Sequence, residues 1–545
     1  MGNISILDCT LRDGLRIIEC EFEDNKIKNL ANGLADSGID IIEMGFLRDK
    51  RKLNYQGNST FFTEPSQITP FLPVMRRQTI FTAFVDYGMF DFDSLEERKD
   101  GYIDGIRVGF TKKNYEECFD DVIRCMRIVQ ERGYKLLMQG VNSLGYTDSE
   151  YLQLINAANE LKPYAFAVVD TYGAMYDEDL THYFSLIDYN LKDEIQLDFH
   201  SHNNYQLSFS LAQKLISIAG RRNIIIDCTL NGVGKVAGNL NTELIINYLN
   251  RKYGFDYDED LILDLIDTYT YSLKQEHNWG YSIPAFLAGE FKSHPNNIIY
   301  LTEKFRLDTK DIKYILSMID EKKRQRYDYD NIERLYIEYN SSKVDDTNSV
   351  EKLKDLFLEK KCVLLLGPGN TIATHKDRIN SFIAKHHPIV ITINYVPDDY
   401  VADFAFFGSN KRYEEAANKR VNTNAEIIVT SNIKDSDGDN YVINYSKVIE
   451  VGYRHFDNST IMLLNLLKRL NVSKVFIAGV DGFVKGGANY YDSHLDYRRD
   501  TEKYIDLNRE TEMMLRQFKL KTANKMDIRF ITPSAYEHVF EKFVF

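Results

Sequence analysis

The stretch Leu7-Asp8-Cys9-Thr10-Leu11-Arg12-Asp13-Gly14 decides the fold of this chain. It overlaps the end of an apolar run, Ile4 to Leu7, that indicates a β-strand. An open, doubly wound α/β sheet would carry a glycine-rich dinucleotide fingerprint after its first strand. Charged side chains stand there instead, at Arg12 and Asp13. Because a closed barrel places its catalytic groups at the C-terminal ends of its strands, this arrangement favours a barrel.

Apolar runs rich in Ile and Val alternate with helical patterns from Ile4 to about residue 230, which is typical of repeated βα units around a parallel sheet. The helical segments carry apolar residues three to four positions apart, as at Leu207, Leu211 and Leu215. The eight predicted strands are Ile4 to Leu7, Ile39 to Met44, Ile80 to Val85, Ile106 to Gly109, Lys135 to Met138, Ala165 to Val169, Ile195 to Phe199 and Ile224 to Cys228. Eight such units predict a TIM (β/α)8 barrel.

The rest of the chain is organised differently. Residues 258–338 have helical spacing throughout, and a polar segment near residue 341 predicts a linker. The strand pattern then restarts, with predicted strands at Val363 to Leu366, Ile389 to Ile393, Phe404 to Phe407, Glu426 to Val429, Lys447 to Val451, Lys474 to Ala478 and Asp527 to Ile531. We therefore expect a barrel (1–257), a helical extension (258–340), a linker (341–355) and a second, Rossmann-like α/β domain (356–545).

Length and composition limit the classes of protein to consider. A chain of 545 residues exceeds one ordinary hydrophobic core, and 44% hydrophobic with 27% charged residues indicates a folded, soluble protein. A net charge of -14 argues against a nucleic-acid partner. No apolar run reaches the roughly 18 to 20 residues of a membrane span, and the six scattered cysteines indicate reduced thiols. We expect a cytoplasmic protein that forms a homo-oligomer.

Three polar clusters follow predicted strands that are neighbours in a closed barrel. They are Arg12-Asp13-Gly14, His200-Ser201-His202-Asn203-Asn204, and the glycine-rich loop Gly232 to Asn239. Because side chains alternate along a strand, His200 and His202 point to the same side. With Asp13 they offer two imidazoles and a carboxylate, a set that suits a divalent ion, and Asn239 adds a neutral oxygen. An isolated His-x-His pair is often structural, but the three clusters together predict a metal site.

The motif Asp8-x-Thr10-Leu11-Arg12-Asp13-Gly14, with His200-x-His202 and the loop ending at Asn239, resembles the DRE-TIM metallolyase superfamily. That superfamily is HMGL-like and includes 4-hydroxy-2-oxovalerate aldolase, hydroxymethylglutaryl-CoA lyase and isopropylmalate synthase. The resemblance covers about residues 1–330. It implies that Asp13, His200 and His202 bind the metal, with Asn239 at or beside it, and that Arg12 stabilises the enolate of a 2-keto acid such as pyruvate. Mn²⁺ is the expected ion, with Mg²⁺, Co²⁺ and Zn²⁺ as alternatives.

Within the superfamily, the sequence after His200 looks most like the aldolases, and Tyr281 resembles their catalytic tyrosine. The chain departs from them after Gly14, where the aldolases place an acid-base histidine and Leu15-Arg16-Ile17-Ile18 stands here. Arg16 indicates an acceptor that is more anionic or more hydroxylated than acetaldehyde. Glu43 and Tyr281 are the candidate acid-base groups, and the alternative role for Glu43 is to orient Arg12.

The predicted activity is that of a carbon-carbon lyase of the aldolase type, acting on a 2-keto acid and an aldehyde through a metal-stabilised enolate. An acyl-CoA-dependent, Claisen-type synthase or lyase is the alternative. Polar residues at the predicted strand ends are candidate substrate contacts: Arg16, Arg107, Gln139, Asn142, Asp170 and Thr171.

In the second domain, the strand that ends at Leu366 runs into a glycine-rich turn before a helical pattern. Such a turn exposes backbone N–H groups to a phosphate or carboxylate, although it also serves as a plain tight turn. The domain resembles the nucleotide-sugar fold of family 42 sialyltransferases, which implies a nucleotide or nucleotide-sugar ligand and a role in surface-polysaccharide synthesis. A nucleotide-sugar transferase and a non-catalytic interaction module are the alternatives. The candidate contacts are Gly367, Gly369, Asn370, Thr371, Asn394 and Asp481.

Overall fold

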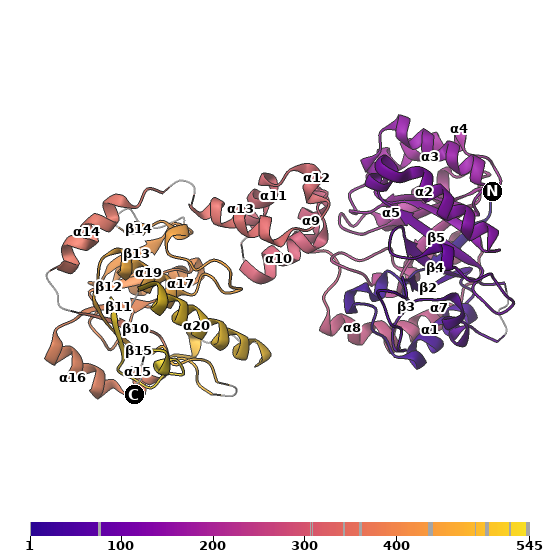
Figure 1. The fold of residues 1–545 in the computed structure, drawn as a ribbon. Helices are drawn as coiled ribbons and strands as arrows, with labels where there is room; N and C mark the ends of the chain where they lie inside the picture. The colour runs from indigo at the N-terminus through magenta and orange to yellow at the C-terminus, as the bar shows by residue number, and fades with distance from the viewer. Residues whose placement is uncertain are drawn as a thin grey trace. The chain divides into compact units, whose positions relative to one another are not determined.

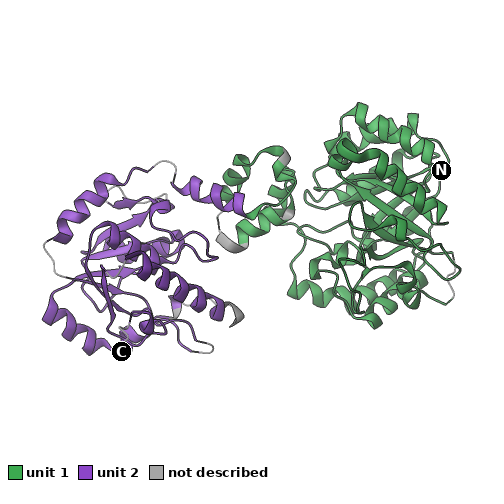
Figure 2. Ribbon diagram, viewed as in Figure 1, with its two compact units in different colours: residues 1–329 green, residues 330–545 purple. Residues whose placement is uncertain are grey.

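The structure is a computed structural model that describes the chain apart from residues 1, 75–77, 306, 308, 342–343, 359–361, 434–439, 485–486, 496–500, 523–524 and 541–545. The chain forms two compact units, residues 1–329 and 330–545 (Figure 2). Each unit contains its own sheet of parallel strands (Figure 1). In the part of the chain that the structure describes, no helix is both long and apolar enough to cross a membrane.

The first unit contains a closed barrel of parallel strands with the order β1-β9-β8-β7-β6-β5-β4-β2, and a pairing between β1 and β2 closes it. These strands are β1 Ile4–Asp8, β2 Ile41–Leu47, β4 Ile80–Asp86, β5 Gly105–Phe110, β6 Lys135–Gly140, β7 Ala165–Asp170, β8 Gln196–Ser201 and β9 Ile224–Cys228. All eight predicted strands are confirmed, and so is the TIM barrel. A short strand, β3 Phe61–Phe62, pairs with β2 and was not predicted.

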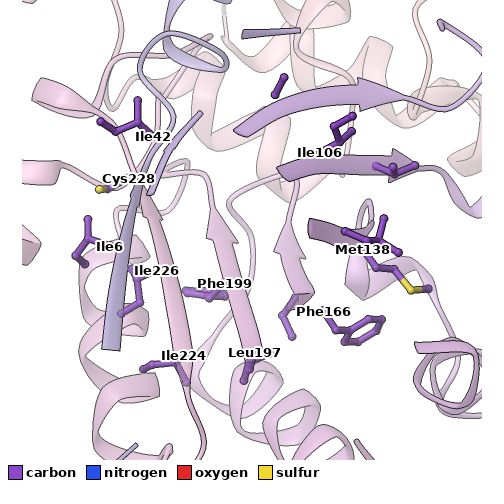
Figure 3. Packing of buried hydrophobic residues seen from close by; sticks show 14 of the residues in the cluster. Ile6, Ile42, Ile106, Met138, Phe166, Leu197, Phe199, Ile224, Ile226 and Cys228 are labelled. Carbon is purple, nitrogen blue, oxygen red and sulfur yellow. The ribbon is translucent and has the colours of Figure 1, made fainter. Parts of the chain in front are cut away.

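Helices follow the barrel strands and bury one face of each against them. They are α1 Asp24–Asp36, α2 Lys112–Glu131, α3 Asp148–Leu161, α4 Asp177–Asn190, α5 Ser208–Ile218 and α6 Thr242–Tyr253. Alternate strand residues such as Ile106, Phe199 and Ile226 lie in the hydrophobic layer that these helices share (Figure 3). The intervening residues of the same strands must therefore face the barrel interior. In this unit those interior positions include Arg107 and Asp227, both buried.

The chain between the barrel and the second unit is helical, as predicted for residues 258–338. After α7 Glu259–Leu265 comes a π-helical turn, Ile266–Thr270, and then α8 Tyr271–Glu276, α9 Ile283–Glu290, α10 Pro295–Phe305, α11 Thr309–Met318, α12 Glu321–Arg324 and α13 Tyr329–Ser341. The boundary between the compact units falls at the start of α13, before the predicted linker.

The second unit contains a parallel sheet with the order β14-β13-β12-β11-β10-β15-β16. The strands are β10 Val363–Leu366, β11 Ile389–Ile393, β12 Phe404–Phe407, β13 Glu426–Thr430, β14 Tyr441–Ile443, β15 Lys474–Ala478 and β16 Asp527–Phe530. Its helices are α14 Thr347–Leu358, α15 Thr371–Thr374, α16 Lys376–His386, α17 Asn410–Glu415, α18 Ala417–Val421, α19 Ser459–Arg469 and α20 Thr501–Thr522. The second α/β sheet is as predicted, and its Rossmann-like ancestry stays a prediction.

Two local predictions for the second unit are wrong. Residues 447–451 do not form a strand, because the Asn444 side chain accepts the N–H of Ser446 and caps a short 3-10 helix, Tyr445–Lys447. Most of the segment 341–355 is also not a free linker. Helix α14 begins within it, and the buried carboxylate of Asp346 accepts hydrogen bonds from Arg469 at 2.6 and 2.9 Å. That ion pair anchors the segment to the second unit.

Candidate active site

The loop after β1 is a tight turn over the C-terminal end of the barrel. The carbonyl of Cys9 accepts the N–H groups of Arg12, Asp13 and Gly14 at 3.1, 2.8 and 3.2 Å. A Cβ atom on Gly14 would lie 2.6 Å from the side chain of Val233, so glycine lets this loop approach the loop after β9. The turn thus brings Arg12 and Asp13 together beside the glycine-rich loop.

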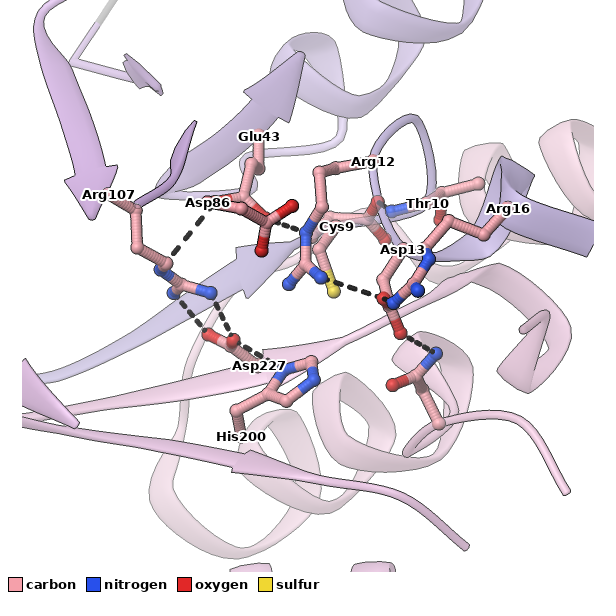
Figure 4. A network of polar contacts seen from close by, with 12 residues as sticks. Cys9, Thr10, Arg12, Asp13, Arg16, Glu43, Asp86, Arg107, His200 and Asp227 are labelled. Carbon is pink, nitrogen blue, oxygen red and sulfur yellow. Dashed lines mark hydrogen bonds and ion pairs between the residues drawn. The ribbon is translucent and has the colours of Figure 1, made fainter. Parts of the chain in front are cut away.

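The guanidinium of Arg12 is buried and held in one orientation (Figure 4). Its Nε donates to Glu43 at 2.5 Å and its Nη1 donates to Asp13 at 2.7 Å. Its plane lies over the ring of Phe84, with 4.6 Å from Cζ to the ring centroid. The third nitrogen, Nη2, is buried and has no hydrogen-bond partner among the described residues. Because an unsatisfied buried donor is costly, this atom indicates a ligand that would accept from it.

Asp13, His200 and His202 form a cluster in which one potential ligand atom of each lies within 4.8 Å of the others. The Nδ1 atom of His200 lies 2.8 Å from a carboxylate oxygen of Asp227, and Nδ1 of His202 lies 3.2 Å from the carbonyl oxygen of Asp170. Because the Asp227 carboxylate only accepts, the neutral ring of His200 carries its proton on Nδ1 and keeps Nε2 for a ligand. Nε2 of His202 lies 3.3 Å from the carboxylate of Asp13.

Asn239 completes this cluster. Its Nδ2 donates to Asp13 at 3.1 Å and to the Val233 carbonyl at 3.0 Å. Its Oδ1 is buried and has no partner among the residues that the structure describes. Two imidazole nitrogens, a carboxylate and an amide oxygen are a donor set that fits a divalent cation. The predicted metal ligands are therefore brought together as the sequence suggested.

The electrostatics keep these ligands in the forms that bind a cation. Burial alone would raise the pKa of Asp13, but the charge of Arg12 holds that pKa well below its usual range. Burial lowers the pKa of His200, which favours the neutral imidazole. Cations bind carboxylates and neutral imidazoles, so this site needs no proton release from Asp13 or His200 at neutral pH.

An ion cluster inside the barrel supports the site, and the sequence analysis missed two of its members, Asp198 and Asp227. Arg107 donates to Asp227 at 2.6 and 2.9 Å and to Asp198 at 2.9 Å, and its Nε lies 3.5 Å from Glu43. Burial raises the pKa of Asp198 well above its usual range, whereas Arg107 and His200 overcome burial and lower that of Asp227. Asp227 lies in the otherwise apolar strand β9, which was the signal that could have identified it, whereas Asp198 shares β8 with other polar residues.

The other predicted contacts lie around this centre. Arg107 is fully buried, so its geometry supports Asp227 rather than the predicted direct contact with substrate. Gln139 is buried at the end of β6 with an unpartnered Oε1. Burial raises the pKa of Asp170 to about 6, and its carboxylate accepts the N–H groups that begin the next loop. The N–H of Asn142 donates to Thr171 Oγ1 at 2.8 Å.

Arg16 and Tyr281 lie at the periphery of the site. The Nη1 atom of Arg16 is 3.4 Å from Asp13, and nearly half of its side chain is exposed. Tyr281 is exposed and stands one residue before Ser282, which caps α9. A hydrogen bond of 3.0 Å from the N–H of Gly280 to the carbonyl of Val236 attaches this segment to the glycine-rich loop. The structure thus places Tyr281 near that loop but outside the hydrogen-bonded cluster.

In the second unit, most of the predicted nucleotide contacts lie at the carboxyl ends of β10 and β15, where the strand order changes direction, and Asn394 follows β11. They bond to one another or to neighbouring residues. The N–H and hydroxyl of Thr371 both donate to Asp481, and the N–H of Gly369 donates to the carbonyl of Gly479. The side chain of Asn394 donates to Ser459 and accepts the N–H of Gly408. Gly367 donates its N–H to Ala478, and Asn370 begins α15.

Comparison with known proteins found similarity in the first unit of the chain. Residues 107–268 match the family model described as HMGL-like. The chain is 24% identical over 315 residues to the 4-hydroxy-2-oxovalerate aldolase of Pelotomaculum thermopropionicum, which covers 57% of this chain and 89% of that protein. It is also 24% identical over 271 residues to the 2-isopropylmalate synthase of Halalkalibacterium halodurans, covering 48% of this chain and 51% of that protein.

Among solved structures, the HMG-CoA lyase of Brucella melitensis aligns with a TM-score of 0.42 and 14% identity, over 50% of this chain and 100% of that one. The first unit thus combines a closed barrel of parallel strands with an Asp-His-His cluster that could hold a metal ion. The first unit of the chain is therefore similar to the HMGL-like (DRE-TIM) family. This family includes aldolases and acyl-CoA-dependent synthases and lyases, and it generally uses a divalent metal.

Proposed function

We propose that the first unit is a divalent-metal-dependent lyase of the aldolase type, which makes or breaks the carbon-carbon bond next to the carbonyl of a 2-keto acid such as pyruvate. The observation that carries this proposal is the buried, unpartnered Nη2 of Arg12 beside the cluster of Asp13, His200 and His202. A fixed donor beside a cation site suits the negative charge that develops on a keto oxygen as an enolate forms.

Each group in the site has a separate task. Asp13, His200, His202 and Asn239 would hold the cation, which supplies positive charge to the carboxylate and keto oxygens of the substrate when it is bound. Arg12 would donate from Nη2 to the enolate oxygen, while Glu43 and Asp13 fix its plane. Asp227 keeps the proton of His200 on Nδ1. Glu43 therefore orients Arg12, and this favours the positioning role over acid-base chemistry.

We propose Mn²⁺ as the ion in the cell, because a mixed set of imidazole, carboxylate and amide donors suits a metal of intermediate softness. Mg²⁺, Co²⁺ and Zn²⁺ remain alternatives with the same ligands. The acyl-CoA-dependent alternative is supported by the likeness to a 2-isopropylmalate synthase. It predicts release of a free thiol when the protein is incubated with a 2-keto acid and acetyl-CoA, which an aldolase would not produce.

We predict that the full chain with Mn²⁺ exchanges the methyl protons of pyruvate for deuterium in the absence of any aldehyde. Proton NMR measures this rate directly. His200→Ala should lower it at least about 100-fold, because losing a group that merely orients a ligand already costs about 10- to 100-fold. His182→Ala is the matched control, since His182 is exposed and pairs with Asp148. No exchange with any of the four ions, or equal exchange in His200→Ala, would contradict the proposal.

For the second unit we propose nucleotide or nucleotide-sugar binding at the carboxyl ends of β10 and β15. Ligands of open parallel sheets bind where the strand order changes direction, which supports this location. Because Asp481 already occupies the N–H of Thr371, we expect a phosphate to bind elsewhere than at that amide. Titration calorimetry of the full chain with CMP should show saturable heat. Absence of heat with CMP and with UDP would leave the interaction-module alternative.

A further inference from the structure

The glycine-rich loop that carries Asn239 to the metal cluster has a strained backbone. Val236 adopts a φ of 58°, in the left-handed region that β-branched residues rarely occupy. Such a conformation persists only where neighbouring contacts hold it. Two residues further on, Gly238 lies so close to the carbonyl of Gly232 that a Cβ atom would collide with the oxygen. The position of Asn239 therefore depends on contacts from outside the loop.

A segment of the helical extension, residues 277–290, supplies contacts of this kind, and we call it the strap. It contains the turn after α8 and all of α9. The indole of Trp279 donates to the carbonyl of Asn231, directly before the glycine-rich loop, at 2.9 Å. A Cβ atom on Gly238 would lie 3.2 Å from Cδ1 of Trp279, so the indole packs directly against that glycine. The buried Trp279 side chain thus contacts the loop near both of its ends.

The residue after Trp279 holds the middle of the loop. The N–H of Gly280 donates to the carbonyl of Val236 at 3.0 Å, so this bond is made to the strained residue itself. The ammonium of Lys274, in α8, lies 5.3 Å from the centroid of the indole ring and adds a cation–π contact to its packing. Two consecutive strap residues therefore fix the loop at its start, in its middle and near its end.

The strap also holds the loop after β8, which carries His202. The side chain of Asn204 donates to the carbonyl of Ala285, in α9, at 2.8 Å. The two loops are bonded to each other as well, because the N–H of Asn203 donates to the carbonyl of Gly238 at 2.9 Å. The strap thus contacts both of these loops, and each loop carries a candidate metal ligand.

We propose that the strap is a clamp on these two loops and that Trp279 is the positioning residue that keeps Asn239 in the donor set. This inference rests on the proposed metal-dependent function. Docking of the strap and binding of the cation favour the same arrangement of the loops, so each strengthens the other by the same factor. When the strap opens, Val236 loses the bond that holds its backbone, and Asn239 loses its fixed position.

Hydrogen exchange of the wild-type full chain tests this linkage without any substitution. The Gly280 N–H reports docking, because its hydrogen bond crosses from the strap to Val236. Mass spectrometry of a peptide that covers residues 277–283 follows its exchange with and without saturating Mn²⁺. We expect exchange at least about fivefold slower with Mn²⁺, the lower end of common coupling strengths. Helix α16, in the second unit, is the control and should exchange equally in both conditions.

Titration calorimetry with Mn²⁺ tests the same coupling from the other side. Trp279→Ala should raise the Kd for Mn²⁺ about tenfold or more, because losing a group that orients a ligand costs about 10- to 100-fold. Trp279→Phe keeps an aromatic ring and loses only the bond to Asn231, so its Kd should lie between those of the wild type and Trp279→Ala.

Tyr257→Phe is the matched control. Tyr257 is also a buried aromatic residue with one hydrogen bond from its polar tip, and it donates to Asp40, directly before β2 at the opposite end of the barrel, at 2.7 Å. Its loss should change the Kd for Mn²⁺ less than about twofold, because distant sites act independently.

Two results would overturn the clamp while the metal site stands. One is strap exchange that is equal with and without saturating Mn²⁺, and the other is equal Mn²⁺ affinity in folded Trp279→Ala and Tyr257→Phe. If Trp279→Ala does not fold, the exchange measurement on the wild-type chain decides alone. No Mn²⁺ binding by the wild-type chain would overturn the proposed function and this inference together.

Discussion

Arg12→Lys is expected to slow the methyl exchange of pyruvate about 100- to 1,000-fold while Mn²⁺ still binds. The guanidinium fixes three donors at once, with Nε on Glu43, Nη1 on Asp13 and Nη2 left for the substrate. A lysine ammonium cannot keep this planar arrangement. Loss of one fixed donor to a developing oxyanion costs about that factor in other enzymes. NMR exchange rates and calorimetric titration with Mn²⁺ measure the two quantities.

Arg48→Lys provides the matched control, because Arg48 also lies over an aromatic ring, at 4.3 Å from the centroid of Phe46, and pairs with Asp86. It is expected to change the exchange rate less than about threefold. If Arg12→Lys exchanged as fast as Arg48→Lys, Arg12 would not be the group that stabilises the enolate. If Arg12→Lys lost Mn²⁺ binding as well, its main task would be to hold Asp13.

Arg107→Leu is expected to lower the free energy of unfolding of the first unit by about 3 to 5 kcal/mol. Removing the fully buried guanidinium leaves Asp227 and Asp198 in the barrel interior without Arg107, and breaking a buried ion pair from one side costs about that much. Trp279 is the only tryptophan of the chain and lies in this unit. Its fluorescence during urea denaturation therefore reports on the first unit.

Arg124→Leu is the comparison for this stability measurement. Arg124 also pairs with two aspartates, but its side chain is half exposed, so the loss should be much smaller than for Arg107→Leu. Arg107→Lys keeps a charge in the barrel and should lie between the two variants. Equal stability of Arg107→Leu and Arg124→Leu would show that the interior carboxylates are neutral without Arg107. Weaker Mn²⁺ binding in Arg107→Leu is also expected, because Asp227 orients His200.

Much of the first unit could be predicted because its signals are local. An apolar run of four to six residues followed by a helical pattern indicates a βα unit wherever it occurs, and all eight barrel strands were found in this way. The strand predicted at residues 447–451 is wrong because one side chain, Asn444, turns the chain into a 3-10 helix. The segment 341–355 looked like a linker because its polar residues gave no sign that Asp346 would be buried against Arg469.

The sequence by itself determined the barrel and the set of candidate metal ligands. Residue type and position along the strand are enough for that. His200 and His202 lie on either side of Ser201, so their side chains point to the same side of the strand. Asp13 comes shortly after the first strand. Only the tertiary structure decided how these groups are oriented. The hydrogen bonds of Arg12 to Glu43, of Asn239 to Asp13 and of His200 to Asp227 are contacts between distant parts of the chain. Such contacts exist only once the strands have closed, because the closed barrel brings residues far apart in sequence to one end.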